Sequence, residues 1–274
     1  MKNEILRRLS ALALGLALLL NAAPLPQAFA VEDDTDASSS DSADSTDTAD
    51  KTAVTTADND PTVTAAAANA PALDATAALL VSPESDMVLY EKNADEKRYP
   101  ASTTKIMTAL LTLENVSDLS AVVTAEASDF ENVTSDSSNA GIKVGEQVTV
   151  KDLLYALMLP SANEAAYMLA RHVGGSWEQF VDMMNERAAE LGCTGTHFCN
   201  PCGLHEDDHY TTAHDLYLIA KEAMKDATFR DIVSTVQHRM AKTNLHEERI
   251  ILTTNQLIFS SFQPWSYANC LGIK

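Results

Sequence analysis

The stretch Ser102-Thr103-Thr104-Lys105 places a serine hydroxyl and a lysine amine three positions apart. On a helix, residues i and i+3 lie on one face, so the two groups can meet. Serine is a weak nucleophile and needs a base within hydrogen-bond distance, which lysine can be when burial lowers its pKa. The spacing predicts Ser102 as a nucleophile with Lys105 as its general base. The alternative is a helix cap followed by a solvated lysine.

A second polar pair, Ser161 and Asn163, follows Leu159-Pro160 on an expected turn between two helices. Here Ser161 is a candidate proton relay, and Asn163 is a candidate for holding a substrate amide through its carboxamide. Both residue types also cap helices, and Asn163 directly precedes an apolar helical stretch. Capping is therefore the alternative to a functional role.

Apolar periodicity indicates the elements that would position these residues. Two β-prone runs, residues 76–82 and 87–93, predict a hairpin. Pro100 suits the first turn of a helix, whose positive end favours developing negative charge near Ser102. Helices are predicted over residues 101–115, 148–159, 163–175, 176–193 and 211–226, and a strand-like run, 269–274, closes the sequence. Helices and strands in separate blocks indicate an α+β class.

The first 75 residues differ in composition from the rest. Residues 1–30 combine a basic start, a short apolar run and Ala28-Phe29-Ala30, which predicts a signal peptide and export to the extracytoplasmic cell envelope. Residues 31–75 form an acidic Ser/Thr/Ala-rich stretch expected to be a disordered linker, either a stalk or a simple spacer. With a net charge of −20, the chain is not expected to bind nucleic acid, or anionic lipid unaided. Residues 76–274 are expected to form one folded catalytic domain.

Four cysteines, Cys193, Cys199, Cys202 and Cys270, leave the redox state open, since an exported protein could pair them in ways that the sequence does not reveal. Cys199 and Cys202 have C-x-x-C spacing, but no second such motif accompanies them. Structural cysteines are favoured, and no metal is expected.

Together the motifs resemble those of the penicillin-recognising serine enzymes. The likeness runs from about Ala77 to Lys274 and is closest to the low-molecular-weight penicillin-binding proteins, which are serine-type D-alanyl-D-alanine carboxypeptidases. It includes the long stretches LYEKNADEKRYPASTTKIMTALL, LLYALMLPSANEAA and NPCGLHEDDHYTTAHDL. The resemblance implies that Ser102 is acylated, that Lys105 is its base, and that Ser161 and Asn163 form the second motif. Lys274, in LGIK, would be the third-motif lysine that binds the substrate carboxylate.

The same resemblance implies a β-lactamase/DD-peptidase-like fold, an antiparallel sheet packed with helices plus a helical subdomain. His209-Tyr210-Thr211 matches a family stretch and is expected to give structural support. The implied activity removes the terminal D-alanine from peptidoglycan stem peptides through an acyl-enzyme, without a cofactor, in cell-wall biosynthesis. β-Lactam antibiotics would acylate the same serine.

The third motif is incomplete in this sequence, which stops at Lys274. We therefore expect a fold that is incomplete at its C-terminal side, a poorly active product from residues 31–274, and membrane association only through a further C-terminal part. One alternative is a serine β-lactamase, although no Glu-x-x-x-Asn lies between Asn163 and Lys274. Another is a non-catalytic wall-binding fragment.

Overall fold

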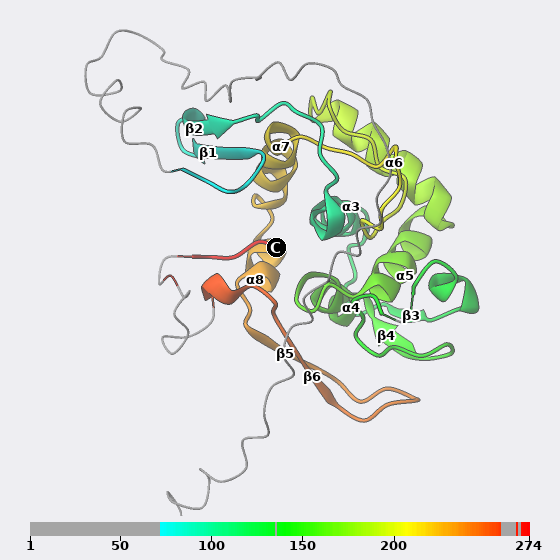
Figure 1. Ribbon diagram of the computed structural model, residues 1–274. Helices are drawn as coiled ribbons and strands as arrows, with labels where there is room; N and C mark the ends of the chain where they lie inside the picture. The colour runs from blue at the N-terminus through cyan, green and yellow to red at the C-terminus, as the bar shows by residue number, and fades with distance from the viewer. Residues whose placement is uncertain (1–71, 135, 259–266, 268–269) are drawn as a thin grey trace, which may run out of the picture. The chain divides into compact units, whose positions relative to one another are not determined.

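The computed structural model describes residues 72–134, 136–258, 267 and 270–274 (Figure 1). All of these belong to one unit that spans Ala49–Lys274. The predicted signal peptide and all but the last residues of the predicted linker lie outside the described residues.

The described strands form three antiparallel pairs. Strands β1 (Ala78–Ser82) and β2 (Met87–Lys92) make the predicted hairpin, with an irregularity in register between Leu80 and Val81. The other pairs are β3 (Val122–Thr124) with β4 (Gln147–Thr149), and β5 (Gln237–Met240) with β6 (Arg249–Leu252). The α+β class is confirmed, but these short strands after the hairpin were not predicted, since three or four residues carry little periodicity.

The predicted C-terminal strand is wrong for the residues that the structure describes. Residues 270–274 have no regular secondary structure. Gly272 has a φ of +87°, in the left-handed region, and a Cβ there would lie 2.1 Å from the carbonyl oxygen of Val233. The chain therefore leaves the extended conformation at this glycine, where its backbone packs on the end of a helix.

All five predicted helices are present. They are α3 (Lys105–Asn115), α4 (Val150–Met158), α5 (Asn163–Gly174), α6 (Trp177–Glu190) and α7 (Ala213–Ala223), and α8 (Ala227–Val233) is an additional short helix. Three 3₁₀ helices accompany them, η1 (Ala101–Thr104), η2 (Ala127–Phe130) and η3 (Gln256–Ile258). The boundaries follow local chemistry. Thr149 accepts a hydrogen bond from the Asp152 N–H and so starts α4, and Gly175, with a φ of +83°, ends α5.

Helix α3 is the centre of the packing. It contacts α4, α5, α6, α7 and α8, and Figure 1 shows it between the β1–β2 hairpin and α4. Its side chains Met107 and Ala109 are completely buried, as are Leu153 and Leu157 of α4. Because α3 begins at Lys105, the core that fixes this helix also fixes the candidate base.

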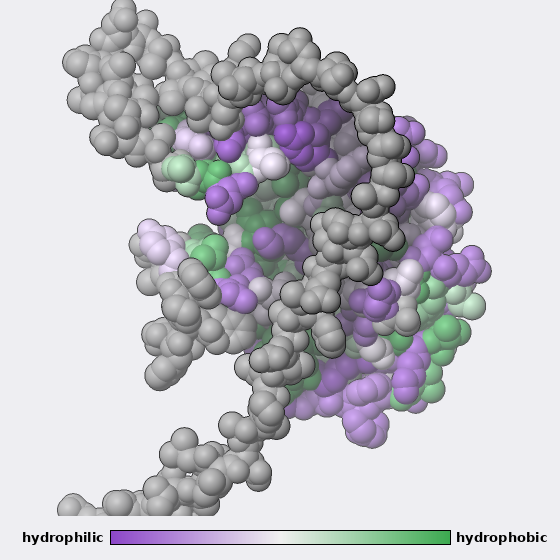
Figure 2. All heavy atoms as spheres, in the orientation of Figure 1, coloured by the Kyte–Doolittle hydropathy of each residue, from purple (hydrophilic) through white to green (hydrophobic). Residues whose placement is uncertain are grey.

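Hydrophilic residues cover much of the visible surface in Figure 2, and hydrophobic ones gather at the β1–β2 hairpin, where Leu80, Met87 and Leu89 are exposed. Among the described residues, no helix has the length and apolar character needed to cross a membrane.

Arg171 of α5 ties η2 to the helical core. Its Nε and Nη2 atoms each lie 2.8 Å from a carboxylate oxygen of Asp129, and Nη2 also donates to the Thr124 carbonyl at 2.8 Å. The Asp129 side chain is only 2 % exposed. Removal of the guanidinium would leave a buried carboxylate without its counter-charge.

We expect Arg171→Ala to lower the free energy of unfolding by about 3 kcal/mol, measured by urea denaturation, because an uncompensated buried charge is costly. Arg239→Ala is the matched control. It removes an exposed ion pair with Glu248 and should cost less than about 1 kcal/mol. Equal losses for the two variants would contradict this role of Arg171.

Candidate active site

Ser102 and Lys105 meet at the start of α3, as the spacing predicts. The first turn differs from the prediction, because Ser102 lies in the 3₁₀ helix η1 rather than in the α-helix. Pro100 is the N-cap of η1, and Ala101 has a φ of +47°. In this tighter turn the Lys105 Nζ lies 3.3 Å from the Ser102 Oγ, within reach for proton transfer.

Lys105 is completely buried, and its ammonium group reaches acceptors from three separate segments. Besides Ser102, it donates to Asn163 Oδ1 at 2.8 Å and to the Cys202 carbonyl oxygen at 2.6 Å. Burial lowers the pKa of Lys105 to about 8, against the opposing influence of Cys202 and Glu164. At that pKa roughly a tenth of the lysine is neutral at pH 7, so it can accept a proton from the serine.

Asn163 serves Lys105 instead of capping its helix, so the capping alternative is wrong for this residue. It is the first residue of α5, and the N-cap is Ala162, which makes no side-chain cap. Two residues earlier, Ser161 has a φ of +66°, a conformation that is costly for a residue with a Cβ. Its hydroxyl is buried and has no hydrogen-bond partner among the described residues. Ser161 is thus free to bond a ligand.

The turn at residues 200–204, to which the sequence motifs gave no role, supplies the third acceptor of Lys105. Asn200 Oδ1 accepts from the backbone N–H groups of Cys202, Gly203 and Leu204, at 3.2, 2.7 and 3.2 Å. This closes a tight turn and leaves the Cys202 carbonyl directed at Lys105. The sequence signal that could have revealed this turn is its Asn-Pro-x-Gly pattern, which is typical of turns.

His209 links the turn that carries Ser102 to Cys199, in the supporting role expected for its stretch. Its Nδ1 accepts a hydrogen bond from the Cys199 N–H at 3.0 Å, so the proton of the neutral ring is on Nε2. That Nε2 lies 2.8 Å from the Thr104 Oγ1, to which it donates. Burial lowers the pKa of His209 to about 4, which keeps the ring neutral.

The cysteines give this region no covalent link, because all four are free thiols. Burial raises the pKa of Cys202, although Lys105 opposes this. The thiol next to the candidate base is therefore protonated.

Lys274 lies beside the same site. Its Nζ donates to the Leu157 and Met158 carbonyl oxygens, at 3.2 and 3.0 Å, at the C-terminal end of α4. Burial, and then repulsion from Lys105, lower the pKa of Lys274 to about 7. The structure therefore joins Ser102, Lys105 and Asn163 by direct contacts and places Lys274 within electrostatic range of Lys105.

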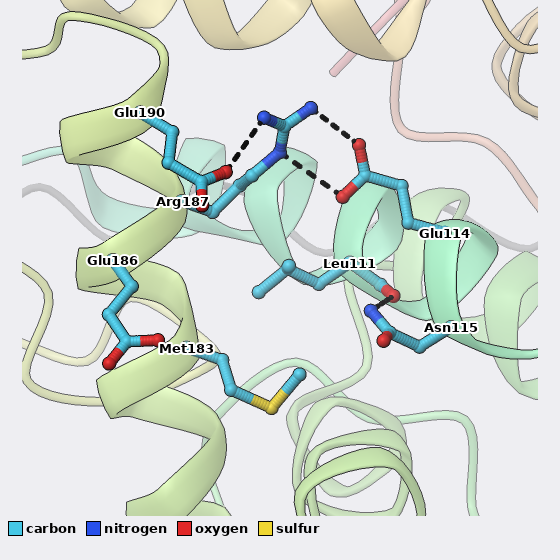
Figure 3. Close-up of a pocket in the computed structure, with 7 residues that line it drawn as sticks. All are labelled: Leu111, Glu114, Asn115, Met183, Glu186, Arg187 and Glu190. Carbon is cyan, nitrogen blue, oxygen red and sulfur yellow. Dashed lines mark hydrogen bonds and ion pairs between the residues drawn. The ribbon is translucent and has the colours of Figure 1, made fainter.

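A hollow of about 330 Å³ at the other end of α3 is a separate feature (Figure 3). Its walls come from the last residues of α3 and from α6, and Arg187 of α6 bonds across it to Glu114 of α3 and along its own helix to Glu190. Figure 3 shows Leu111 and Met183 directed into the space between the two helices. It lacks a nucleophile with an adjacent base, so the candidate active site is at Ser102.

Comparison with known proteins gives one consistent family. The family model described as D-alanyl-D-alanine carboxypeptidase (Peptidase_S11) matches residues 64–264. A D-alanyl-D-alanine carboxypeptidase of Streptomyces sp. (strain K15) is 38 % identical over 202 residues, 68 % of this chain and 66 % of that protein. The carboxypeptidase DacF of Bacillus subtilis (strain 168) is 35 % identical over 186 residues, 68 % of this chain and 48 % of DacF.

Solved structures agree with these relatives. The crystal structure of the Streptomyces K15 DD-transpeptidase has a TM-score of 0.64 at 36 % identity, with 69 % of this chain and 77 % of that chain covered. An arginine-to-leucine mutant of the same transpeptidase has a TM-score of 0.68, with 75 % of this chain and 81 % of that one covered. This confirms the expected DD-peptidase fold. The chain spans less than two thirds of the length of the curated relatives named above.

Gly203 permits the close contact between the turn at residues 200–204 and the turn that carries Ser102. It has a φ of +89°, and a Cβ there would lie 1.8 Å from the Ala101 carbonyl oxygen. We expect Gly203→Ala to lower the melting temperature by about 10 °C or more, because both the backbone strain and the clash must be relieved. Gly192→Ala is the matched control, since Gly192 has a φ of +83° and a Cβ there would meet nothing within 4 Å. A Gly203→Ala variant as stable as Gly192→Ala would refute the clash.

Proposed function

The chain belongs to the D-alanyl-D-alanine carboxypeptidase family, and on this premise we propose that it is a serine-type carboxypeptidase acting on peptidoglycan stem peptides. It removes the terminal D-alanine through an acyl-enzyme and is covalently inhibited by penicillin. The observation that carries the proposal is the fully buried Lys105, with its lowered pKa, 3.3 Å from the Ser102 hydroxyl. As part of the proposal, the protein is exported and works in the cell envelope, where its substrate is found.

In the acylation step, the Ser102 Oγ attacks the carbonyl carbon between the two terminal D-alanines, and neutral Lys105 accepts the serine proton. Backbone N–H groups, including that of Ser102 in the first turn of η1, stabilise the oxyanion of the tetrahedral intermediate. The C–N bond then breaks, and the leaving amine receives, through Ser161, the proton that Lys105 accepted from Ser102. The Ser161 hydroxyl has no hydrogen-bond partner among the described residues, and its availability supports this role.

Substrate binding would use Asn163 and Lys274. The Asn163 Oδ1 already bonds Lys105, which leaves its amide N–H groups for a substrate carbonyl. Lys274 would hold the terminal carboxylate, whose negative charge would raise the pKa of this lysine and keep it protonated. Water finally attacks the acyl-enzyme and releases the shortened peptide.

Besides water, an amine is a second candidate acceptor of the acyl group, since the solved Streptomyces K15 structures are called DD-transpeptidases. An amine in place of water would convert hydrolysis into transpeptidation by the same acyl-enzyme. Product analysis with and without added glycine or D-alanine separates the two outcomes. We propose hydrolysis as the principal reaction.

Penicillin should label Ser102. Trypsin releases residues 99–105 as one peptide, because Arg98 and Lys105 flank it, and tandem mass spectrometry can place the adduct within that peptide. We expect Ser102→Ala to abolish labelling, whereas Thr103→Ser in the same peptide should retain it. An adduct on another residue would refute Ser102 as the nucleophile.

Lys105→Arg should slow acylation by about 100-fold or more, because arginine keeps the charge but does not deprotonate near neutral pH. Lys151→Arg, an exposed position on α4, is the control and should acylate at the parent rate. In the parent protein, the first-order acylation rate at saturating penicillin should rise with pH, reach half its maximum near pH 8 and then level off. The sign follows from the lowered pKa of Lys105, since the neutral amine is the reactive form. A flat profile from pH 6 to pH 9 would exclude Lys105 as the titrating base.

A further inference from the structure

Residues 138–142, which we call the strap, lie against the first turn of α5. The Ser138 carbonyl oxygen accepts a hydrogen bond from the Asn163 N–H at 2.9 Å. The Ala140 N–H donates to Glu164 Oε1 at 2.7 Å, and the Ile142 N–H approaches the same oxygen at 3.4 Å. The strap is thus held by the residue that contacts Lys105 and by the next residue in the chain.

The opposite edge of the strap is held by a positive charge. Arg249 of β6 donates to the carbonyl oxygens of Ala140 and Gly141, at 3.3 and 3.0 Å. Its guanidinium also pairs with the completely buried Glu146, which accepts from the Lys143 N–H at 3.1 Å. The strap's N–H groups therefore donate to a carboxylate, and a guanidinium donates to its C=O groups.

The carboxyl group of Glu164 is almost completely buried and only partly hydrogen-bonded. The residue is 1 % exposed, and Oε2 has no hydrogen-bond partner among the described residues. Burial raises the pKa of Glu164, while the Ala140 and Ile142 N–H groups and the Arg249 charge act in the opposite direction. A buried carboxyl group of this kind is costly unless it serves the surrounding structure.

Glu164 also acts on Lys105, whose pKa it raises against the effect of burial. The charged or titratable groups that act on Lys105 are Glu164 from α5, the Cys202 thiol from the turn at residues 200–204, and Lys274. The thiol is protonated and Lys274 is a base, so Glu164 is the member of this set whose ionised form favours the charged form of Lys105. Removal of its charge should therefore make Lys105 easier to deprotonate.

We propose that Glu164 is a positioning residue for the reaction: its carboxylate ties the strap to the first turn of α5, and its negative charge acts on the nearby Lys105 ammonium. The effect of Glu164 on catalysis rests on the proposed function, whereas the electrostatic coupling between Glu164 and Lys105 does not. By fixing the start of α5, Glu164 holds the Asn163 carboxamide at 2.8 Å from Lys105. By its charge, it sets the pH range over which Lys105 becomes neutral.

The test compares Glu164→Gln, which removes the charge but keeps an acceptor oxygen, with Glu164→Asp, which keeps the charge on a shorter side chain. The first-order acylation rate by a fluorescent penicillin is measured from pH 5.5 to pH 9.5. We expect Glu164→Gln to move the half-maximal pH downwards by about half a unit or more and to lower the plateau rate by about tenfold. Glu164→Asp should lower the plateau but keep the parent half-maximal pH.

Glu114→Gln is the matched control, because it removes a carboxylate from the far end of α3, where Glu114 pairs with Arg187. It should leave both the half-maximal pH and the plateau unchanged. An unchanged half-maximal pH in Glu164→Gln would overturn the proposal, even if the plateau falls, since a merely structural role gives that result. If Glu164→Gln does not fold, Glu164→Asp decides: a shifted half-maximal pH in that variant would contradict the role of charge.

A second measurement separates this inference from the proposed function. The ¹³Cε signals of the lysines are titrated by NMR, with Lys105 assigned through Lys105→Arg. A downward shift of the Lys105 midpoint in Glu164→Gln supports the coupling even if the parent protein is not acylated by penicillin, a result that would refute the proposed function alone. Acylation of the parent protein without any midpoint shift would refute the coupling alone.

Discussion

The arrangement of this domain depends on the burial of one ammonium group. Lys105 has no exposed surface and is satisfied by a hydroxyl from the preceding turn and by a carboxamide and a backbone carbonyl from two distant segments. Leaving a buried charge without such partners would cost several kcal/mol, so the start of α3, the start of α5 and the turn at residues 200–204 must converge. The helical core around α3 makes that convergence possible, and the burial that accompanies it lowers the pKa of the candidate base.

Local chemistry made much of this predictable. The five main helices follow from apolar periodicity and from caps such as Thr149 and Gly175, whose preferences act within a few residues. The meeting of Ser102 and Lys105 follows from helical spacing, and it survives in the tighter 3₁₀ turn because i and i+3 also align there. These features depend on residues that are close together in the sequence, so they can be predicted from one sequence alone.

The remaining features depend on partners far along the chain. Asn163 has the sequence context of a cap, and only Lys105, 58 positions earlier, makes it a hydrogen-bond acceptor for the base. The Cys202 carbonyl is a backbone group, so no side-chain pattern could indicate its role. Strands of three or four residues, such as β3 and β4, are fixed by pairing rather than by their own pattern. Residues 270–274 were misread as a strand, because Ile273 packs against the core without entering a sheet while Leu271 is exposed.

The neutral ring of His209 makes the stability of the fold depend on pH under acidic conditions. Its pKa of about 4 in the folded protein lies below the 6.5 of a free histidine, so the unfolded chain binds a proton more readily than the folded one. The contribution of His209 to stability is therefore complete above pH 6.5, declines as the pH falls towards 4, and is lost below that. Because Nδ1 accepts the Cys199 N–H, protonation near pH 4 removes this link beside the turn that carries Ser102. Between pH 6.5 and 4, acidification therefore lowers the stability of the fold through His209 before most ordinary carboxylates are protonated.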